Sequence, residues 1–191
     1  MPDVDLREAV RVRGRIEGDL VKVDDFLNHK VDADVMRSIG SDMASLLLPH
    51  RPEMLLTAEA SGIPPAVACS LAMNVPMVYA KKYLGTGDRY SYAREVISPT
   101  KGVEYRVEVA RRVLTPGSRI AIVDDILSQG RTAEALGEIV EEAGCDVAAF
   151  VFALEKSFMD GRDRLENHDW TVYSLVDVTS IADQTIEVAD A

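Results

Sequence analysis

Short apolar runs alternate along the chain with longer stretches in which apolar residues recur every three or four positions. The runs at residues 54–58, 75–80, 120–123 and 146–154 are mainly aliphatic and have the length of buried strands. Residues 132–143, which follow one of these runs, show the helical spacing instead. Strands that alternate with helices indicate an α/β fold, in which a mostly parallel central sheet is flanked by helices.

One strand–loop–helix unit carries the clearest chemical signal. The apolar run that starts at Ile120 is predicted to end at two adjacent carboxylates, Asp124 and Asp125, and a loop with Gly130 leads to a helix opened by Thr132. Unpaired N–H groups and the positive end of the helix dipole face outward at such a helix start, which suits a phosphate. The carboxylates would repel a phosphate, so they favour sugar hydroxyls or a cation. A phosphorylated sugar would use the whole unit, and an ordinary strand-to-helix turn is the structural alternative.

A second unit of the same kind precedes the first. The predicted strand at 54–58 leads through Glu59 and a loop of small residues into a helix expected over 66–73. Gly62 in this loop allows the backbone to approach a ligand closely. A plain capped helix is the alternative, but two anion-binding loops in one chain favour a ligand with two phosphorylated ends.

The predicted strand at 75–80 delivers Lys81 and Lys82 to its end. A lysine pair is most often a solvated surface feature. At the carboxyl end of an α/β strand, beside two anion-binding loops, it is better interpreted as neutralising a leaving diphosphate.

Composition narrows the class of protein. The 191 residues suffice for one domain, and 21 lysines and arginines against 32 acidic residues give a net charge of −11. Nucleic acid is therefore an improbable main partner. Cys69 and Cys145 lie among apolar or small residues, which indicates core thiols in a reduced, cytoplasmic protein. We see neither a signal peptide nor a membrane-spanning run and expect no membrane association.

The stretch from Ile120 to Thr132 resembles the signature of the type I phosphoribosyltransferases. In that family an apolar strand, two acidic residues and a T-G-G-T-like loop hold the ribose 5-phosphate of phosphoribosyl pyrophosphate (PRPP). Only one glycine remains in the loop of this chain, and Arg131 either crowds the loop or adds a charge-assisted bond to the phosphate. By this resemblance the residues that bind PRPP are Ser128, Gln129, Gly130, Arg131 and Thr132, together with Ala60, Ser61, Gly62 and Lys82.

Residues 20–30 look like the N-terminal hood of bacterial xanthine phosphoribosyltransferases, where an L-K-V-D-x-F-L-N-H run covers the purine. The resemblance implies that Val21 and Asn28 contact the base, with valine where the family usually has leucine. A turn-capping role is the alternative for Asn28. The run Glu155-Lys156-Ser157-Phe158 is similar to the E-K-S-F turn of the same enzymes. Lys156 would then donate to the carbonyl groups of an oxopurine, and a plain surface lysine is the alternative.

The resemblance covers roughly residues 20–165. It implies one type I phosphoribosyltransferase domain over residues 1–191, with a hood from about 15–30 and 155–191 and a flexible β-hairpin flap at about 83–110. The flap would close over PRPP and exclude water. Its candidate cations are Arg89, Arg94, Lys101 and Arg106.

The implied activity is purine salvage, in which xanthine and PRPP give XMP and pyrophosphate. Asp124, Asp125 and Lys81 are the expected catalytic residues, and Mg²⁺ would be held by the substrate rather than directly by the protein. The family also implies a homodimer. We expect Asp125→Asn to lose most activity and Arg131→Gly to retain it.

Two alternatives stay open at this point. The same fold could act on hypoxanthine, guanine or adenine. The chain could also be a non-catalytic regulator that senses PRPP, as purine-repressor proteins do, but such proteins add a DNA-binding module. Only about 20 residues precede Val21, and the net charge is acidic, so this second alternative is disfavoured.

Overall fold

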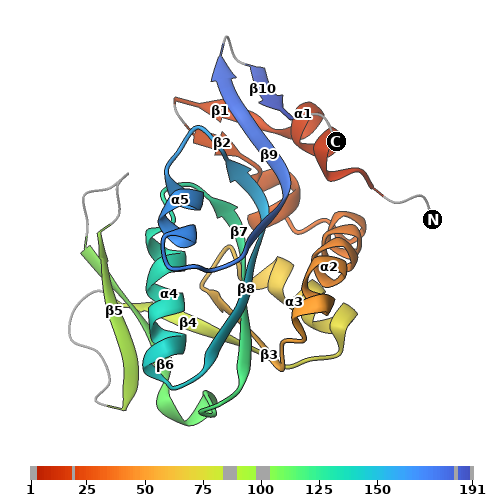
Figure 1. Ribbon diagram of the computed structural model, residues 1–191. Coiled ribbons are helices and arrows are strands. Elements are labelled where there is room, and N and C mark those ends of the chain that lie inside the picture. The colour runs from red at the N-terminus through yellow and green to blue at the C-terminus, as the bar shows by residue number, and fades with distance from the viewer. Residues whose placement is uncertain (1–3, 19, 84–89, 98–103, 183–184, 190–191) are drawn as a thin grey trace.

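The computed structural model describes residues 4–18, 20–83, 90–97, 104–182 and 185–189. Its main feature is an eight-stranded sheet in the order β10-β9-β8-β7-β3-β4-β6-β5 (Figure 1). Neighbours among β9, β8, β7, β3 and β4 are parallel, and β10 and the β6–β5 pair add antiparallel edges. The strands are β3 (Met54–Ala58), β4 (Met77–Tyr83), β5 (Ser91–Ile97), β6 (Glu104–Ala110), β7 (Arg119–Leu127), β8 (Asp146–Lys156), β9 (Val172–Ala182) and β10 (Thr185–Val188).

Helices cover both faces of the parallel strands, which explains why these strands are apolar along their length. Helices α2 (Ala33–Leu47) and α3 (Ile63–Met73) lie on one face, and α4 (Arg131–Glu142) and α5 (Gly161–Glu166) lie on the other (Figure 1). Two buried clusters fill the spaces between sheet and helices. The predicted α/β architecture is confirmed.

The start of α3 differs from the sequence prediction. The helix begins at Ile63 rather than at residue 66, so Pro64 and Pro65 lie in its first turn. Proline is tolerated there because the N–H groups of the first turn have no partner within the helix. The helix ends as expected before Asn74, which adopts a left-handed conformation with φ of 56°.

Strand β7 also runs further than predicted. Its ladder with β8 continues through Asp124 and on to Leu127, so the two carboxylates lie within the strand and not at its end. The backbone bonds of the ladder do not depend on side-chain charge. On its other side β7 pairs with β3 only as far as Ile122. Asp124 and Asp125 therefore border an opening beside a continuous strand.

A crevice forms between β3 and β7 because the chain leaves these neighbours in opposite directions. Helix α3 follows β3 on one face of the sheet, and α4 follows β7 on the other (Figure 1). Such a switch point, at the carboxyl ends of parallel strands, is where α/β sheets bind ligands.

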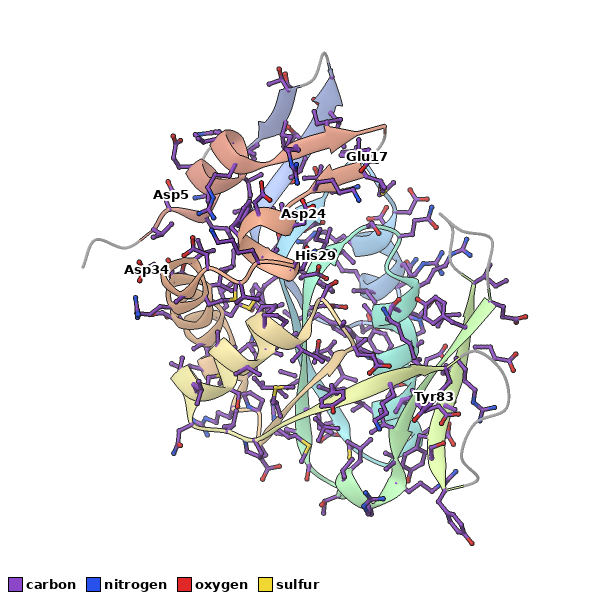
Figure 2. All side chains as sticks on the ribbon, turned by 180° about the vertical axis from the view of Figure 1, so that it is seen from behind. Asp5, Glu17, Asp24, His29, Asp34 and Tyr83 are labelled. Atoms are coloured by element: carbon purple, nitrogen blue, oxygen red, sulfur yellow. The ribbon has the colours of Figure 1, made fainter. Side chains whose placement is uncertain are left out.

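The two ends of the chain lie together, in the segments that were predicted to form the hood. Helix α1 (Leu6–Arg13), the hairpin of β1 (Arg15–Glu17) and β2 (Leu20–Lys22), and a single π-helical turn, η1 (Asp24–Asn28), make up its N-terminal part. α1 contacts β9 and β10, and β1 contacts β10, at the top of Figure 1. Seen from behind in Figure 2, Glu17, Asp24 and His29 lie along this segment, whereas Tyr83 lies near the β5–β6 hairpin.

Strands β5 and β6 form the hairpin that was predicted as a flap. Two of its expected cations, Arg89 and Lys101, lie outside the described residues. Short 3₁₀ turns at Leu48–His50 (η2) and Arg111–Val113 (η3) complete the secondary structure. Within the described ranges no helix is both long and apolar enough to cross a bilayer. Cys69 and Cys145 are buried and unpaired, and burial raises the pKa of the Cys69 thiol to about 12.

Candidate active site

A cavity of about 180 Å³ opens at the crevice between β3 and β7. Both predicted anion-binding loops contribute to its wall, and so do the two carboxylates between them. The lining residues are Ala58, Ser61, Gly62, Lys82, Val96, Tyr105, Asp124, Asp125, Ile126, Leu127, Ser128, Gln129, Gly130, Arg131, Thr132, Ala133 and Phe152.

The loop after β7 ends in a tight turn into α4. Gly130 has a φ of 72°, a left-handed conformation that glycine adopts without strain, and the helix begins at Arg131, one residue before the predicted start. The Glu134 N–H donates to the Gly130 carbonyl oxygen at 2.8 Å, which closes the first turn. The N–H groups ahead of this bond have no partner within the helix, so the loop is suited to an anion.

The loop after β3 approaches the carboxylates at Gly62. A β-carbon on Gly62 would lie 2.2 Å from Asp124 Oδ1 and 2.2 Å from the Thr57 hydroxyl oxygen. No side chain fits there, so the glycine is required by this contact. At the start of the same loop the Glu59 carboxylate accepts a hydrogen bond from the backbone N–H of Lys82 at 2.6 Å. The loop after β3 is therefore hydrogen-bonded to β4 through Glu59 and packs against β7 at Gly62.

The acidic pair occupies the floor between the two loops. Burial and the adjacent charge of Asp125 raise the pKa of Asp124 well above its usual range, although Lys82 acts in the opposite direction. Asp124 Oδ1 accepts from the Asp125 N–H at 2.9 Å. Asp125 Oδ2 accepts from the Asn28 amide at 3.0 Å, and this bond links the hood to the floor of the cavity.

The two lysines of β4 face opposite sides of the sheet, as successive residues of a strand do. Lys82 lines the cavity, with its ammonium group 5.4 Å from the centre of the Tyr105 ring. Lys81 lies opposite Glu108 in the ladder and borders a separate hollow of about 400 Å³. The structure thus brings only Lys82 to the acidic pair, and a catalytic role for Lys81 stays a prediction.

The hairpin packs against α4 beside the cavity. The Tyr105 hydroxyl lies 2.6 Å from the Thr132 hydroxyl oxygen. Arg94 pairs with Glu138 at 2.7 Å and with Glu142 at 2.5 Å. Arg106 pairs with Glu108 at 2.7 Å. Arg94 and Arg106 were predicted as cations that the flap brings to PRPP. In this structure both pair with carboxylates of the protein.

The residues expected to contact the base lie around the hood rather than in the cavity wall. Val21 on β2 is 7% exposed and packs in a core cluster, and Lys156 at the end of β8 is 6% exposed. Asn28 reaches the cavity through its bond to Asp125. Ala60, in the second loop, is exposed and is not among the lining residues.

Some cavity residues were not singled out from the sequence. Tyr105 and Phe152 line the wall from strands β6 and β8. Tyr105 alternates with valines and Phe152 lies in an apolar run, and both patterns indicate only core packing. Sequence pattern carries no signal that separates an aromatic residue in a core from one at a cavity rim. Only the order of the strands places these two beside the loops.

Comparisons with known proteins agree with this geometry. Residues 23–188 match the family profile described as the phosphoribosyl transferase domain. The chain belongs to this family. A xanthine phosphoribosyltransferase of Chloroflexus aurantiacus is 44% identical over 178 residues, which cover 93% of this chain and 82% of that protein. A xanthine phosphoribosyltransferase of Shouchella clausii is 38% identical over 188 residues, which cover 97% and 94%.

Solved structures share the fold of this phosphoribosyltransferase. Adenine phosphoribosyltransferase from Rhodothermus marinus matches with a TM-score of 0.75 at 21% identity, covering 90% of this chain and 98% of that one. The Giardia lamblia enzyme complexed with 9-deazaadenine matches with a TM-score of 0.77 at 16% identity, covering 91% and 98%. At this level of identity the likeness concerns the fold alone.

Arg131 provides a test of how this phosphoribosyltransferase tolerates its altered loop. Within the described part of the chain, its guanidinium donates a long hydrogen bond, 3.4 Å, to the Ile97 carbonyl oxygen. The backbone N–H groups of the loop remain after Arg131→Gly, so we expect kcat/KM for PRPP to fall by no more than about fivefold, the scale of one exposed hydrogen bond. Steady-state kinetics at varied PRPP would measure this. A loss of about a hundredfold or more would contradict the assignment of binding to the loop backbone.

Proposed function

We propose that this chain is a xanthine phosphoribosyltransferase, which converts xanthine and PRPP to XMP and pyrophosphate. The relatives named xanthine phosphoribosyltransferase are 38–44% identical over most of the chain and support this activity. The structural observation that carries the proposal is the cavity in which two anion-binding loops flank a pair of carboxylates. A sugar with phosphate at one end and diphosphate at the other has the matching chemistry.

In this proposal the parts of PRPP occupy distinct parts of the site. The loop at residues 128–132 binds the 5′-phosphate, and the loop at 60–62 with Lys82 binds the diphosphate. Asp124 and Asp125 accept hydrogen bonds from the ribose hydroxyls. Gly62 lies so close to the Asp124 carboxylate that there is no room for a β-carbon. This contact supports the proposal that one ligand extends from one loop to the other.

The proposed reaction is a displacement at C1′ of the ribose. Xanthine reacts as its anion after losing a proton to solvent, and N9 forms the new bond to C1′. The bond from C1′ to the diphosphate oxygen breaks, and its electron pair leaves with pyrophosphate. Positive charge develops on the ribose, and we assign its stabilisation to Asp124 and Asp125. Catalysis then comes from positioning and electrostatics, without a covalent enzyme intermediate.

Mg²⁺ enters the proposal as part of the substrate. Among the described residues, no group of three or more His, Cys, Asp or Glu side chains is arranged to hold a metal ion. Mg²⁺ prefers oxygen ligands and keeps several waters, and the diphosphate of PRPP supplies such oxygens. The contribution of the chain is to bind the diphosphate of that complex through residues 60–62 and Lys82.

Selection of the base is assigned to Lys156 and Asn28. Asn28 is held at the edge of the acidic pair by its bond to Asp125, so its carbonyl oxygen can accept from a purine N–H. Lys156 is the last residue of β8 and is itself buried, and an ammonium group favours the anion of xanthine and its two carbonyl oxygens. Adenine offers an amino group at one of these positions.

Replacing Lys156 with methionine should therefore alter base preference. We expect kcat/KM for xanthine to fall by about 10–100-fold, the value of a charge-assisted hydrogen bond, with a smaller loss for hypoxanthine. The KM for PRPP should stay within about twofold, because Lys156 does not line the cavity. Equal losses for both bases would contradict the role of Lys156 in recognising xanthine.

The proposal includes two properties implied by the family resemblance. We infer a homodimer, which sedimentation analysis of the purified chain would test. We also infer a cytoplasmic location, which is consistent with two buried cysteines that form no disulfide.

The activity itself is tested with the purified chain, PRPP and Mg²⁺. Xanthine, hypoxanthine, guanine and adenine are supplied separately, and pyrophosphate release and nucleotide formation are both measured. The highest kcat/KM is expected for xanthine. A preference for another base would overturn the assigned substrate, and the absence of turnover with every base would overturn the proposed function.

A further inference from the structure

A layer of contacts lies behind the loop that follows β7, on the side away from the cavity. The first residue of α5 presses on this loop, because a β-carbon on Gly161 would lie 2.2 Å from the Ser128 carbonyl oxygen. A β-carbon on Gly130 would lie 2.9 Å from the Gly161 oxygen. Arg164, also on α5, donates from Nε to the Gln129 carbonyl oxygen at 2.8 Å. Two consecutive carbonyl groups of the loop therefore face α5.

The direction of these carbonyl groups fixes the direction of the next N–H groups. In a trans peptide unit the C=O and N–H point in opposite directions. The N–H groups of Gln129 and Gly130 consequently turn away from α5. The cavity lies on that side, since Gln129 and Gly130 line it, whereas Gly161 and Arg164 are not among its lining residues. Consecutive N–H groups directed to one side form an anion-binding nest.

The Arg164 side chain is itself held in place by α4. Its Nη1 pairs with Glu134 Oε2 at 3.0 Å, and Glu134 Oε1 lies 3.2 Å from His168 Nε2. The His168 ring stacks on Trp170, with centroids 4.2 Å apart and planes 8° apart. Trp170 is buried against Gly137 of α4. The guanidinium is thus held between the loop and α4, with Nε directed at the Gln129 carbonyl oxygen.

We propose that Arg164 is a positioning residue for the 5′-phosphate of PRPP. It does not touch the substrate. It holds the Gln129 carbonyl group away from the cavity, and the Gly130 N–H is thereby presented to the phosphate. This inference rests on the proposed function, and specifically on the assignment of the 5′-phosphate to residues 128–132.

The test separates the two ends of PRPP. Arg164→Met removes the donor while keeping an unbranched side chain, and calorimetric titration measures binding of ribose 5-phosphate and of pyrophosphate. We expect the Kd of ribose 5-phosphate to rise about tenfold, the effect of one lost charge-assisted bond, and the Kd of pyrophosphate to stay within about twofold. In turnover, the KM for PRPP should rise while the KM for xanthine does not. Arg37→Met, which breaks the pair of Arg37 with Asp34 on α2, is the matched control and should change neither Kd.

A second variant keeps the inference testable if Arg164→Met does not fold. Arg164→Lys keeps the charge but lacks the planar fork that serves two acceptors at once, so it should show a smaller shift in the same direction. Unchanged binding of ribose 5-phosphate in either folded variant would overturn the inference. Equal weakening of both ligands would overturn it too, because it would indicate a general structural role. If the unmodified chain bound ribose 5-phosphate and turned over no purine, the proposed function alone would fall.

Discussion

Asp124→Asn is expected to abolish most of the activity and at the same time to make the protein more stable. In the proposed mechanism the Asp124 carboxylate stabilises the positive charge that develops on the ribose, and removing such a preorganised charge costs on the order of 10²–10³ in kcat. The amide keeps the shape and still accepts the hydrogen bond from the Asp125 N–H. Steady-state kinetics with saturating xanthine would measure the loss.

The gain in stability follows from the pKa of Asp124, which burial and the charge of Asp125 raise in the folded state. The folded protein holds this proton more tightly than the unfolded chain does, so stability falls as pH rises from the ordinary carboxyl range through the raised pKa. The amide of the variant cannot ionise and does not suffer this loss. Its advantage should therefore build up across that pH range, by about 2–4 °C in Tm for each kcal/mol.

Thermal unfolding at several pH values would check this second effect. The difference in Tm between Asp124→Asn and the unmodified protein should grow with pH and vanish in acid. A variant that is destabilised at neutral pH would contradict the assignment. Asp125→Asn is the companion: it should also lose most activity, and it should lower the pKa of Asp124 by removing the neighbouring charge.

Gly62→Ala is expected to have the second largest effect. The added methyl group would lie 2.2 Å from Asp124 Oδ1 and from the Thr57 hydroxyl oxygen, so either the loop or the carboxylate must move. Displacement of a catalytic group by about 1 Å can cost on the order of 10² in rate. We expect a loss of that size in kcat, together with a higher KM for PRPP. Kinetics and pyrophosphate titration of the folded variant would measure both.

Gly40→Ala is the matched control for this substitution. Its methyl group would lie 2.6 Å from the Ala68 carbonyl oxygen, a collision of similar severity between α2 and α3, and neither residue lines the cavity. This variant should lower Tm while the remaining folded protein keeps its KM for PRPP. If both variants lost catalysis in proportion to their lost stability, the special role of Gly62 would be refuted.

The layered α/β fold was predictable from the apolar pattern of the sequence. Inner strands are buried on both faces and are therefore apolar throughout, whereas each helix is buried on one face and has apolar residues on that face alone. These local requirements leave periods of apolar residues that can be recognised without a structure. The two loops were recognisable for a similar reason, since a glycine between a buried strand and a helix is typical of a tight turn or a close backbone approach. Their place on one cavity depends on β3 and β7 being neighbours, which is a property of topology.

Features that depend on long-range contacts were not predictable. The hydrogen bond between Asn28 and Asp125 joins residues 97 positions apart, and neither segment carries a sequence pattern that indicates contact with the other. The continuation of β7 beyond its two carboxylates depends on the ladder offered by β8. The opposite facing of Lys81 and Lys82 depends on the strand continuing through both, whereas the sequence suggested that the strand stops before them.

Strand β4 pairs with the body of the domain along its first part and with the hairpin along its last part. This division bears on how the enzyme would release its products. As far as Ala80 it pairs with β3 in the body of the domain, and from Lys81 to Tyr83 it pairs with β6 of the hairpin. A swing of the hairpin relative to the body would bend β4 at the junction between these two parts. Lys82 lies in the second part and is proposed to bind the diphosphate, so opening the hairpin would also move this lysine. Opening of the hairpin and release of pyrophosphate would then be coupled.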